Sequence, residues 1–153
     1  MIDPLSAIIQ LFRNDNELNT LVTGRIAAKH KFAMERSSHL GWPVPCNALQ
    51  VSLEAGIPPD LYGGTLPFRL ECRCYGQSQV QAGLIYHVVS RLIEGTERTL
   101  IRLQSNQPNQ YALLYYLNLD SVPILIMEPE LKIDMALIYI QGSFSSCSIT
   151  QEI

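Results

Sequence analysis

Two stretches of the chain alternate apolar and polar residues, a pattern typical of half-buried strands because successive side chains of a strand point to opposite faces. The stretch 68–75 is the more regular of the two. Its apolar face consists of Phe68, Leu70, Cys72 and Cys74. The stretch 47–54 alternates in the same way, with Leu49, Val51 and Leu53 on the apolar side. Each stretch predicts one strand with a single buried face.

The opening of the chain instead repeats apolar residues at helical spacing. Asp3 can cap a helix whose next residue is proline, which costs nothing in the first turn, and this helix is expected to end near Arg13. Asn14 and Glu17 have the spacing of a capping box. They predict a second, short helix that Gly24 ends.

The clearest helical pattern follows the stretch 68–75. Ser78 and Gln81 form another capping box, and Gly95 ends the segment. Between them runs a continuous apolar stripe made of Leu84, Ile85, Val88, Val89, Leu92 and Ile93. The sequence therefore predicts a long amphipathic helix directly after a strand.

Three more β-rich segments complete the chain, at 111–119, 122–127 and 131–140, the last with a continuation toward residue 149. Strands on both sides of one long helix, joined mostly by short connections, favour an α+β domain. We predict an antiparallel or mixed sheet of about four to five strands with helices packed on one face. Residues 1–153 are expected to form a single domain with a long loop at 27–45.

Composition favours a protein whose surface is covered in part by other subunits. Hydrophobic residues make up 47% of the chain and charged residues 16%, against about 25% charged residues in typical soluble domains. No apolar run reaches the ~18 residues of a membrane span, and the first residues lack the features of a signal peptide, so a cytosolic protein without membrane contact is expected. The net charge of −3 argues against general nucleic-acid binding.

No motif in the sequence predicts catalysis, a cofactor or a metal. Cys72, Cys74 and His87 do not have the spacing of a zinc site, no G-x-S-x-G occurs, and Gly63-Gly64 is not followed by the residues of a phosphate loop. The four cysteines are expected to be reduced, small core or near-core residues. We therefore expect a protein that is not an enzyme.

Several short features occur in a suggestive order. They are the helix start Asp3-Pro4-Leu5, the segment Gly24-Arg25-Ile26 after the second helix, the strand entry Trp42-Pro43-Val44-Pro45, and the strand end Cys74-Tyr75-Gly76 before the long helix. This order resembles that of the tail terminator, or tail completion, proteins of long-tailed bacteriophages. The resemblance spans residues 2–95 and, more loosely, the final strands to about residue 149.

The resemblance implies a structural virion protein that caps the tail tube as a homo-oligomeric ring, commonly of six subunits. Such a ring ends tail polymerisation and forms the joint to the head-proximal neck. The implied partners are the tail-tube protein and a neck or head-closure protein, with double-stranded DNA passing through the lumen without specific binding. The implied location is the tail or neck of the virion, after assembly in the host cytoplasm.

Charge is distributed unevenly and predicts where ring subunits could meet. Basic residues gather between 25 and 39, and acidic residues dominate beyond residue 103. In a ring, one patch meets a different patch on the neighbour, so complementary charge favours the contact. The candidate interface residues are Arg25, Lys29, Lys31, Arg36 and Trp42 on one side, and Glu128, Glu130 and Asp134 on the other.

Other interpretations stay open. Trp42 and Leu40 could cover the domain's own core while the neighbouring charges are solvated. The chain could be a different neck component, such as a head-closure or connector-associated protein. It could also be a small ligand-binding or enzymatic α+β domain with a pocket under the loop at 27–45.

Overall fold

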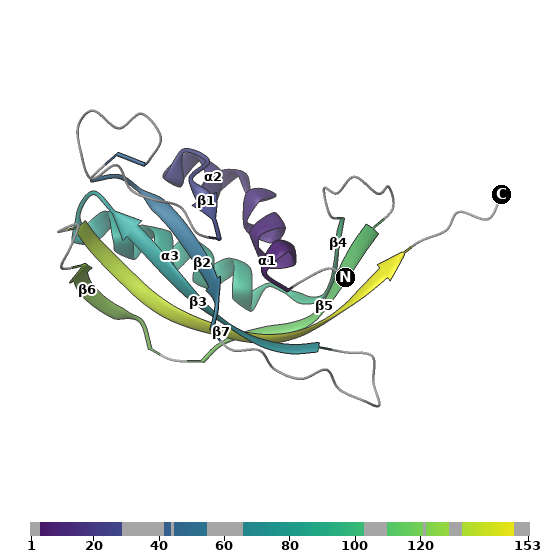
Figure 1. The fold of residues 1–153 in the computed structure, drawn as a ribbon. Coiled ribbons are helices and arrows are strands. Elements are labelled where there is room, and N and C mark those ends of the chain that lie inside the picture. The colour runs from purple at the N-terminus through teal and green to yellow at the C-terminus, as the bar shows by residue number, and fades with distance from the viewer. Residues whose placement is uncertain are drawn as a thin grey trace.

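The computed structural model describes residues 4–28, 42–43, 45–54, 66–102, 110–120, 122–128 and 133–148. Three helices pack on one face of a strongly curved, seven-stranded sheet (Figure 1). The helices are α1 (Pro4–Arg13), α2 (Asn16–Val22) and α3 (Gln79–Glu94). The strands are β1 (Ile26–Ala27), β2 (Ala48–Leu53), β3 (Leu66–Gly76), β4 (Glu97–Arg102), β5 (Gln110–Leu119), β6 (Ile124–Glu128) and β7 (Ile133–Ser148).

The helices begin and end close to the predicted positions, with one correction. The Ser78 hydroxyl caps α3 by accepting a hydrogen bond from the Gln81 amide at 3.3 Å. The cap of α2 is Asp15, not Asn14: its carboxylate accepts from the Leu18 amide at 2.9 Å. Asn14 cannot take this place because it still belongs to the end of α1, where its backbone amide donates to the Gln10 carbonyl. The predicted Asp3 cap lies outside the described residues.

The sheet is mixed and has the strand order β1-β2-β3-β7-β5-β4. Only β1 and β2 run parallel, and every other pair among the described strands is antiparallel. The long strand β7 is central. It pairs with β3 on one side, and on the other side with β6 near its start (Ile133–Leu137) and with β5 over the rest (Ile140–Ser148).

The predicted number of four to five strands was wrong, since the described residues already form a seven-stranded sheet. The two missed strands are β1 and β4. β1 is two residues long, too short to show an alternating pattern. β4 has only Ile101 buried among its six residues, so it lacks the apolar face by which the other strands were predicted.

The main core lies between the helices and the sheet. α1 contributes Ile8 and Phe12, both fully buried, and α3 contributes its predicted stripe, of which Ile85, Val89 and Ile93 are fully buried. Phe68, Leu70, Cys72 and Cys74 of β3 face the helices, as the alternation predicted. Leu84 departs from the prediction, because 44% of it is exposed.

A second, smaller cluster lies on the opposite face of the sheet. It consists of Cys46, Ala48, Tyr75, Ile133 and Met135, and the half-buried Trp42 packs against it. Tyr75 follows Cys74 in β3 and therefore points to this opposite face, where it is buried. On the same face, six residues earlier along β3, Arg69 forms ion pairs with Glu54 at 3.0 Å and Asp120 at 2.7 Å.

The curvature of the sheet separates its two ends. The pairing of β5 with β7 shifts register between Leu114 and Tyr116, and a bulge of this kind bends and twists a strand. Gly142 of β7 permits the close crossing there, since an added Cβ would lie 2.6 Å from the Tyr116 carbonyl oxygen. β4 and β6 lie at opposite ends of the molecule (Figure 1), because β6 pairs with the start of β7 and β4 is joined to the rest of β7 through β5.

Candidate assembly surfaces

β6 is an edge strand with exposed apolar side chains on both of its faces. It pairs only with β7 among the described strands. Its exposed fractions are 47% for Ile124, 49% for Leu125, 41% for Ile126 and 57% for Met127. Because neighbouring side chains of a strand point to opposite faces, no element of the described chain covers either face fully.

Such an edge is unusual for a protein that stays alone in solution. An unpaired edge offers free amide and carbonyl groups to any other strand, and soluble proteins protect edges with charges, proline or bulges. β6 carries none of these between Ile124 and Met127, and its only charged residue is the terminal Glu128. This surface is therefore suited to being covered by another chain.

Acidic residues flank the exposed strand. Glu128 is its last residue, and Asp134 of β7 is the register partner of Met127. Asp134 is half-buried and lines a small hollow beside β6 together with Gln79 of α3. The end of the sheet that holds β6 is thus apolar at its edge and acidic beside it.

β4 is the other well-defined edge strand and differs in chemistry. Arg98, Leu100 and Arg102 follow one another at alternate positions, and all three are exposed, Leu100 by 48%. Ile101, between them, is buried in the main core. Arg98 has a left-handed backbone, with φ of 47°, which bends the strand near its start.

A groove on the helical side is the third candidate surface. It has a volume of about 710 Å³ and runs between α2 and α3. Leu21, Leu84 and Val88 form its apolar lining, and the polar lining consists of Asn16, Glu17, Thr20, His87 and Arg91.

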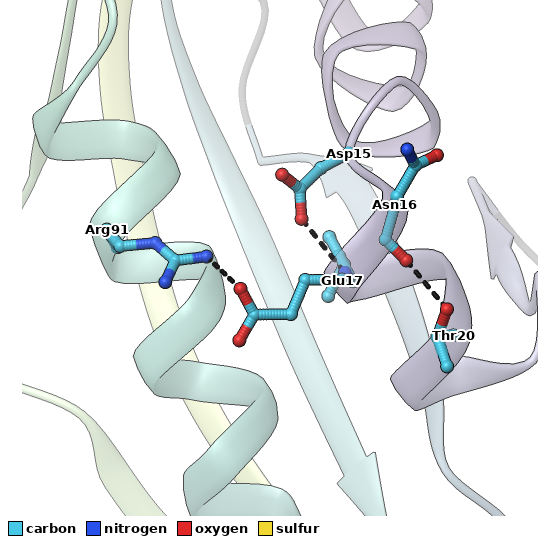
Figure 2. Close-up of polar contacts among 6 residues, drawn as sticks. Asp15, Asn16, Glu17, Thr20 and Arg91 are labelled. Atoms are coloured by element: carbon cyan, nitrogen blue, oxygen red, sulfur yellow. Dashed lines mark hydrogen bonds and ion pairs between the residues drawn. The ribbon is translucent and has the colours of Figure 1, made fainter.

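Figure 2 shows how the polar rim of this groove is held. Arg91 of α3 lies in an ion pair with Glu17 of α2, and this hydrogen bond raises the pKa of the guanidinium. Asp15 caps α2, and the Thr20 hydroxyl donates to the Asn16 carbonyl at 2.9 Å. Because the carboxylate of Glu17 is engaged by Arg91, the groove is better suited to holding an apolar group than to acid–base chemistry.

The structure places three of the predicted interface residues in detail. Arg25 donates from Nη1 to the Asn47 carbonyl at 3.4 Å, and Trp42 packs on the second cluster. Strand register connects them to Asp134, because Ala48 pairs with Tyr75 and Gly76 pairs with Asp134. All three therefore lie at the β6 end of the sheet: Arg25 directly precedes β1, Trp42 packs on the cluster that includes Ala48 of β2, and Asp134 is in β7.

The remaining predicted residues are less completely placed. Glu128 ends β6, while Lys29, Lys31, Arg36 and Glu130 lie outside the described residues, as does most of the predicted loop at 27–45. The interface role of all eight residues stays a prediction. A pocket under that loop also stays a prediction. The groove described above is lined by residues of α2 and α3.

Sequence reasoning missed the exposed edges. The run Ile124–Met127 reads as a buried strand, because four apolar residues in succession are typical of strands covered on both faces. Exposure depends on which strands pair, and no local signal in the sequence indicates that β6 pairs with only one of the described strands. At β4, the spacing of Arg98, Leu100 and Arg102 could have indicated an exposed strand face.

The buried thiols do not form a site. Cys46, Cys72 and Cys74 are free and buried, as predicted, and burial raises the pKa of Cys72 well above its ordinary value, with Cys74 adding to the effect. Within the described ranges, no three histidine, cysteine or acidic residues are grouped so that they could hold a metal. The described helices include none that is long and apolar enough to cross a membrane.

Comparison with known proteins gives one informative result. No protein-family model matches the chain. No curated protein matches it either. Its fold is similar to that of a chain in a solved structure described as "Virion of native gene transfer agent (GTA) particle", with a TM-score of 0.59 and 12% identity over 92% of this chain and 93% of that one. The two chains therefore share a fold along nearly their whole lengths.

Proposed function

We propose that the chain is a structural virion protein that caps the tail tube as a homo-oligomeric ring. The observation that carries the virion part is the fold shared with a chain of a virion particle, which covers both chains almost completely. The tail-capping part rests on the order of sequence features that resembles tail terminator proteins, from the Asp3-Pro4 helix start to the Cys74-Tyr75-Gly76 corner. The ring would end tail polymerisation and join the tube to the neck.

The exposed edges support an assembled protein. β6 presents four exposed apolar residues together with an open strand edge. A ring covers such a surface in every subunit, because each copy offers one patch to one neighbour and receives a different patch from the other. The implied partners are copies of the chain, the tail-tube protein and a neck protein.

The charges of the chain are compatible with DNA passage. DNA has to slide through the ring without being retained, and strong retention requires many phosphate contacts from lysine and arginine. The net charge is −3. Several of the described arginines are also engaged within the subunit, Arg69 with Glu54 and Asp120, and Arg91 with Glu17.

Native mass spectrometry tests the proposal directly. The purified chain is measured alone and after mixing with the tail-tube protein of its virion, and the tubes are imaged by electron microscopy. The expected result is a closed ring, either in solution or only at one end of each tube. A chain that stays monomeric and does not bind tubes would contradict tail capping.

The fold similarity supports a second candidate equally, because it carries no information on a position within the particle. That candidate is another neck component, such as a head-closure or connector-associated protein. Mixing the chain with the neck proteins in place of the tube protein distinguishes the two, since a neck component would bind there and leave tubes uncapped. A small molecule that co-purifies would instead favour a binding function for the groove between α2 and α3.

A further inference from the structure

We infer that β6 of one copy pairs with β4 of the next copy and that this strand pairing is the contact that builds the ring. The inference rests on the proposed function and specifies its interface. The occupant of the exposed β6 edge is thus a second copy of this chain, through a different part of its surface.

The first argument is the position of the two strands. Each is an open edge, with β4 paired only to β5 and β6 only to β7 among the described strands. They lie at opposite ends of the curved sheet (Figure 1). Surfaces at opposite ends of a subunit suit a head-to-tail contact, which closes into a ring when the rotation between copies allows it.

The second argument is apolar coverage. β6 exposes side chains on both faces, so a helix or loop laid on one face would leave the other in water. A strand added at the edge bonds to the free backbone groups and brings its own side chains to both faces. β4 can supply Leu100, which is 48% exposed, to cover one of them.

The third argument is charge complementarity. Arg98 and Arg102 flank Leu100 on the exposed side of β4, and neither forms an ion pair with another described residue. Asp134 of β7 is the register partner of Met127, so an acidic residue lies beside the C-terminal end of β6. Pairing β4 with β6 places the arginine at one end of β4 near this acidic end of β6, whereas pairing two β4 edges would bring arginines together.

The lengths of the two strands agree. The left-handed residue Arg98 bends β4, so the regular part available for pairing is Thr99–Arg102. β6 is five residues long. A short pairing of this size depends on its apolar and charged side chains for specificity, and these are the residues to alter.

A mixing experiment tests whether two different patches meet. Ile126→Lys places a charge on β6 that repels the arginines of β4. Leu100→Lys removes the apolar side chain that β4 contributes and would leave a charge against the apolar side chains of β6. Each variant alone is expected to lose the ring, while an equimolar mixture is expected to form a heterodimer through the one intact contact and nothing larger. If the contact were instead β6 with β6, Leu100→Lys would assemble like the wild type, and that result would overturn the inference.

Leu53→Lys is the matched control. Leu53 is a strand residue with a similar exposure of 45%, located on β2 and outside the proposed contact. This variant is expected to assemble as the wild type does. Circular dichroism melting of all three variants separates loss of contact from loss of folding.

A charge exchange gives a second, independent readout. Arg98→Glu with Arg102→Glu, and separately Glu128→Arg with Asp134→Arg, are each expected to weaken assembly at least about tenfold by opposing like charges. All four changes in one chain are expected to restore it. Failure of the combined variant to recover, with folding intact, would contradict the pairing. A wild-type ring that survives every variant would overturn this contact only, whereas a wild type that never caps tubes would overturn the proposed function.

Discussion

β4 and β6 are both edge strands of one sheet, yet they expose different kinds of side chain to water. β4 presents Arg98 and Arg102 and contains a residue with positive φ, and both charge and bending discourage unwanted strand pairing. β6 presents an unbroken apolar run with no positive-φ residue and no internal charge. The comparison indicates that β4 is protected against non-specific strand pairing and can stay exposed before it binds a specific partner. β6 lacks this protection and is expected to be covered by a partner.

Removing one large side chain from the central strand β7 is expected to have the largest effect, and to destabilise the β4 end of the sheet more than the β6 end. Phe144 of β7 is fully buried and is paired with Leu114 of β5, which in turn carries β4. Phe144→Ala is expected to lower the free energy of unfolding by about 3–5 kcal/mol, the usual cost of removing a buried phenyl ring. Denaturant unfolding measures this loss.

The same variant tests whether the ends are independent. Hydrogen exchange should speed up in β4 and β5 more than in β6, because β6 pairs with Ile133–Leu137 at the other end of β7. Equal acceleration in β4 and β6 would show that the two edges form one cooperative unit.

The next largest effect is expected when a charge is removed from β4, so that it resembles β6. Arg98→Val removes a charge and places a β-branched residue at a φ of 47°, which should cost about 1–3 kcal/mol of folding stability. The surviving folded protein should self-associate more readily, because its second edge has lost a protecting charge. Light scattering against concentration measures this, with Arg98→Lys as the control that keeps the charge. Unchanged scattering would show that the arginine does not protect the edge.

Making β6 resemble β4 should have the opposite effect. Leu125→Lys adds a charge to an edge residue that is 49% exposed, and a surface change of this kind usually alters stability by no more than about 0.5 kcal/mol. Non-specific aggregation of the free chain should fall while its melting temperature stays nearly constant. Aggregation that is as strong as in the wild type would indicate that another surface causes it, for example the groove between α2 and α3.

Salt should have the smallest effect. The charged part of the β4–β6 contact is screened in 1 M salt, where the Debye length is about 3 Å, but the apolar part is not. Ring assembly should therefore weaken without disappearing when salt is raised, as sedimentation velocity can measure. Complete dissociation would mean that charge dominates over the apolar run of β6.

The core and the helices could be predicted from the sequence because their signals are local. The alternation around Cys72 and Cys74 and the Ser78 cap state directly which side chains face the interior. The α2 cap was misplaced by one residue, since Asn14 and Asp15 both suit that role and only the end of α1 decides between them.

The surfaces could not be predicted, because they depend on pairing between distant segments. Ile124–Met127 has the composition of a buried strand, and its exposure follows from the division of β7 between β5 and β6. Likewise, the sequence assigned Trp42 and Asp134 to opposite sides, while register brings both to the β6 end of the sheet. The order of charged residues along the sequence does not determine where the folded chain places them.

Cryo-electron microscopy of the chain bound to tail tubes would test the central proposal most directly. We predict a ring at one end of the tube in which the sheet continues from β6 of each copy into β4 of the next. Tubes without a terminal ring would contradict tail capping. A terminal ring in which β6 faces solvent would contradict the proposed contact.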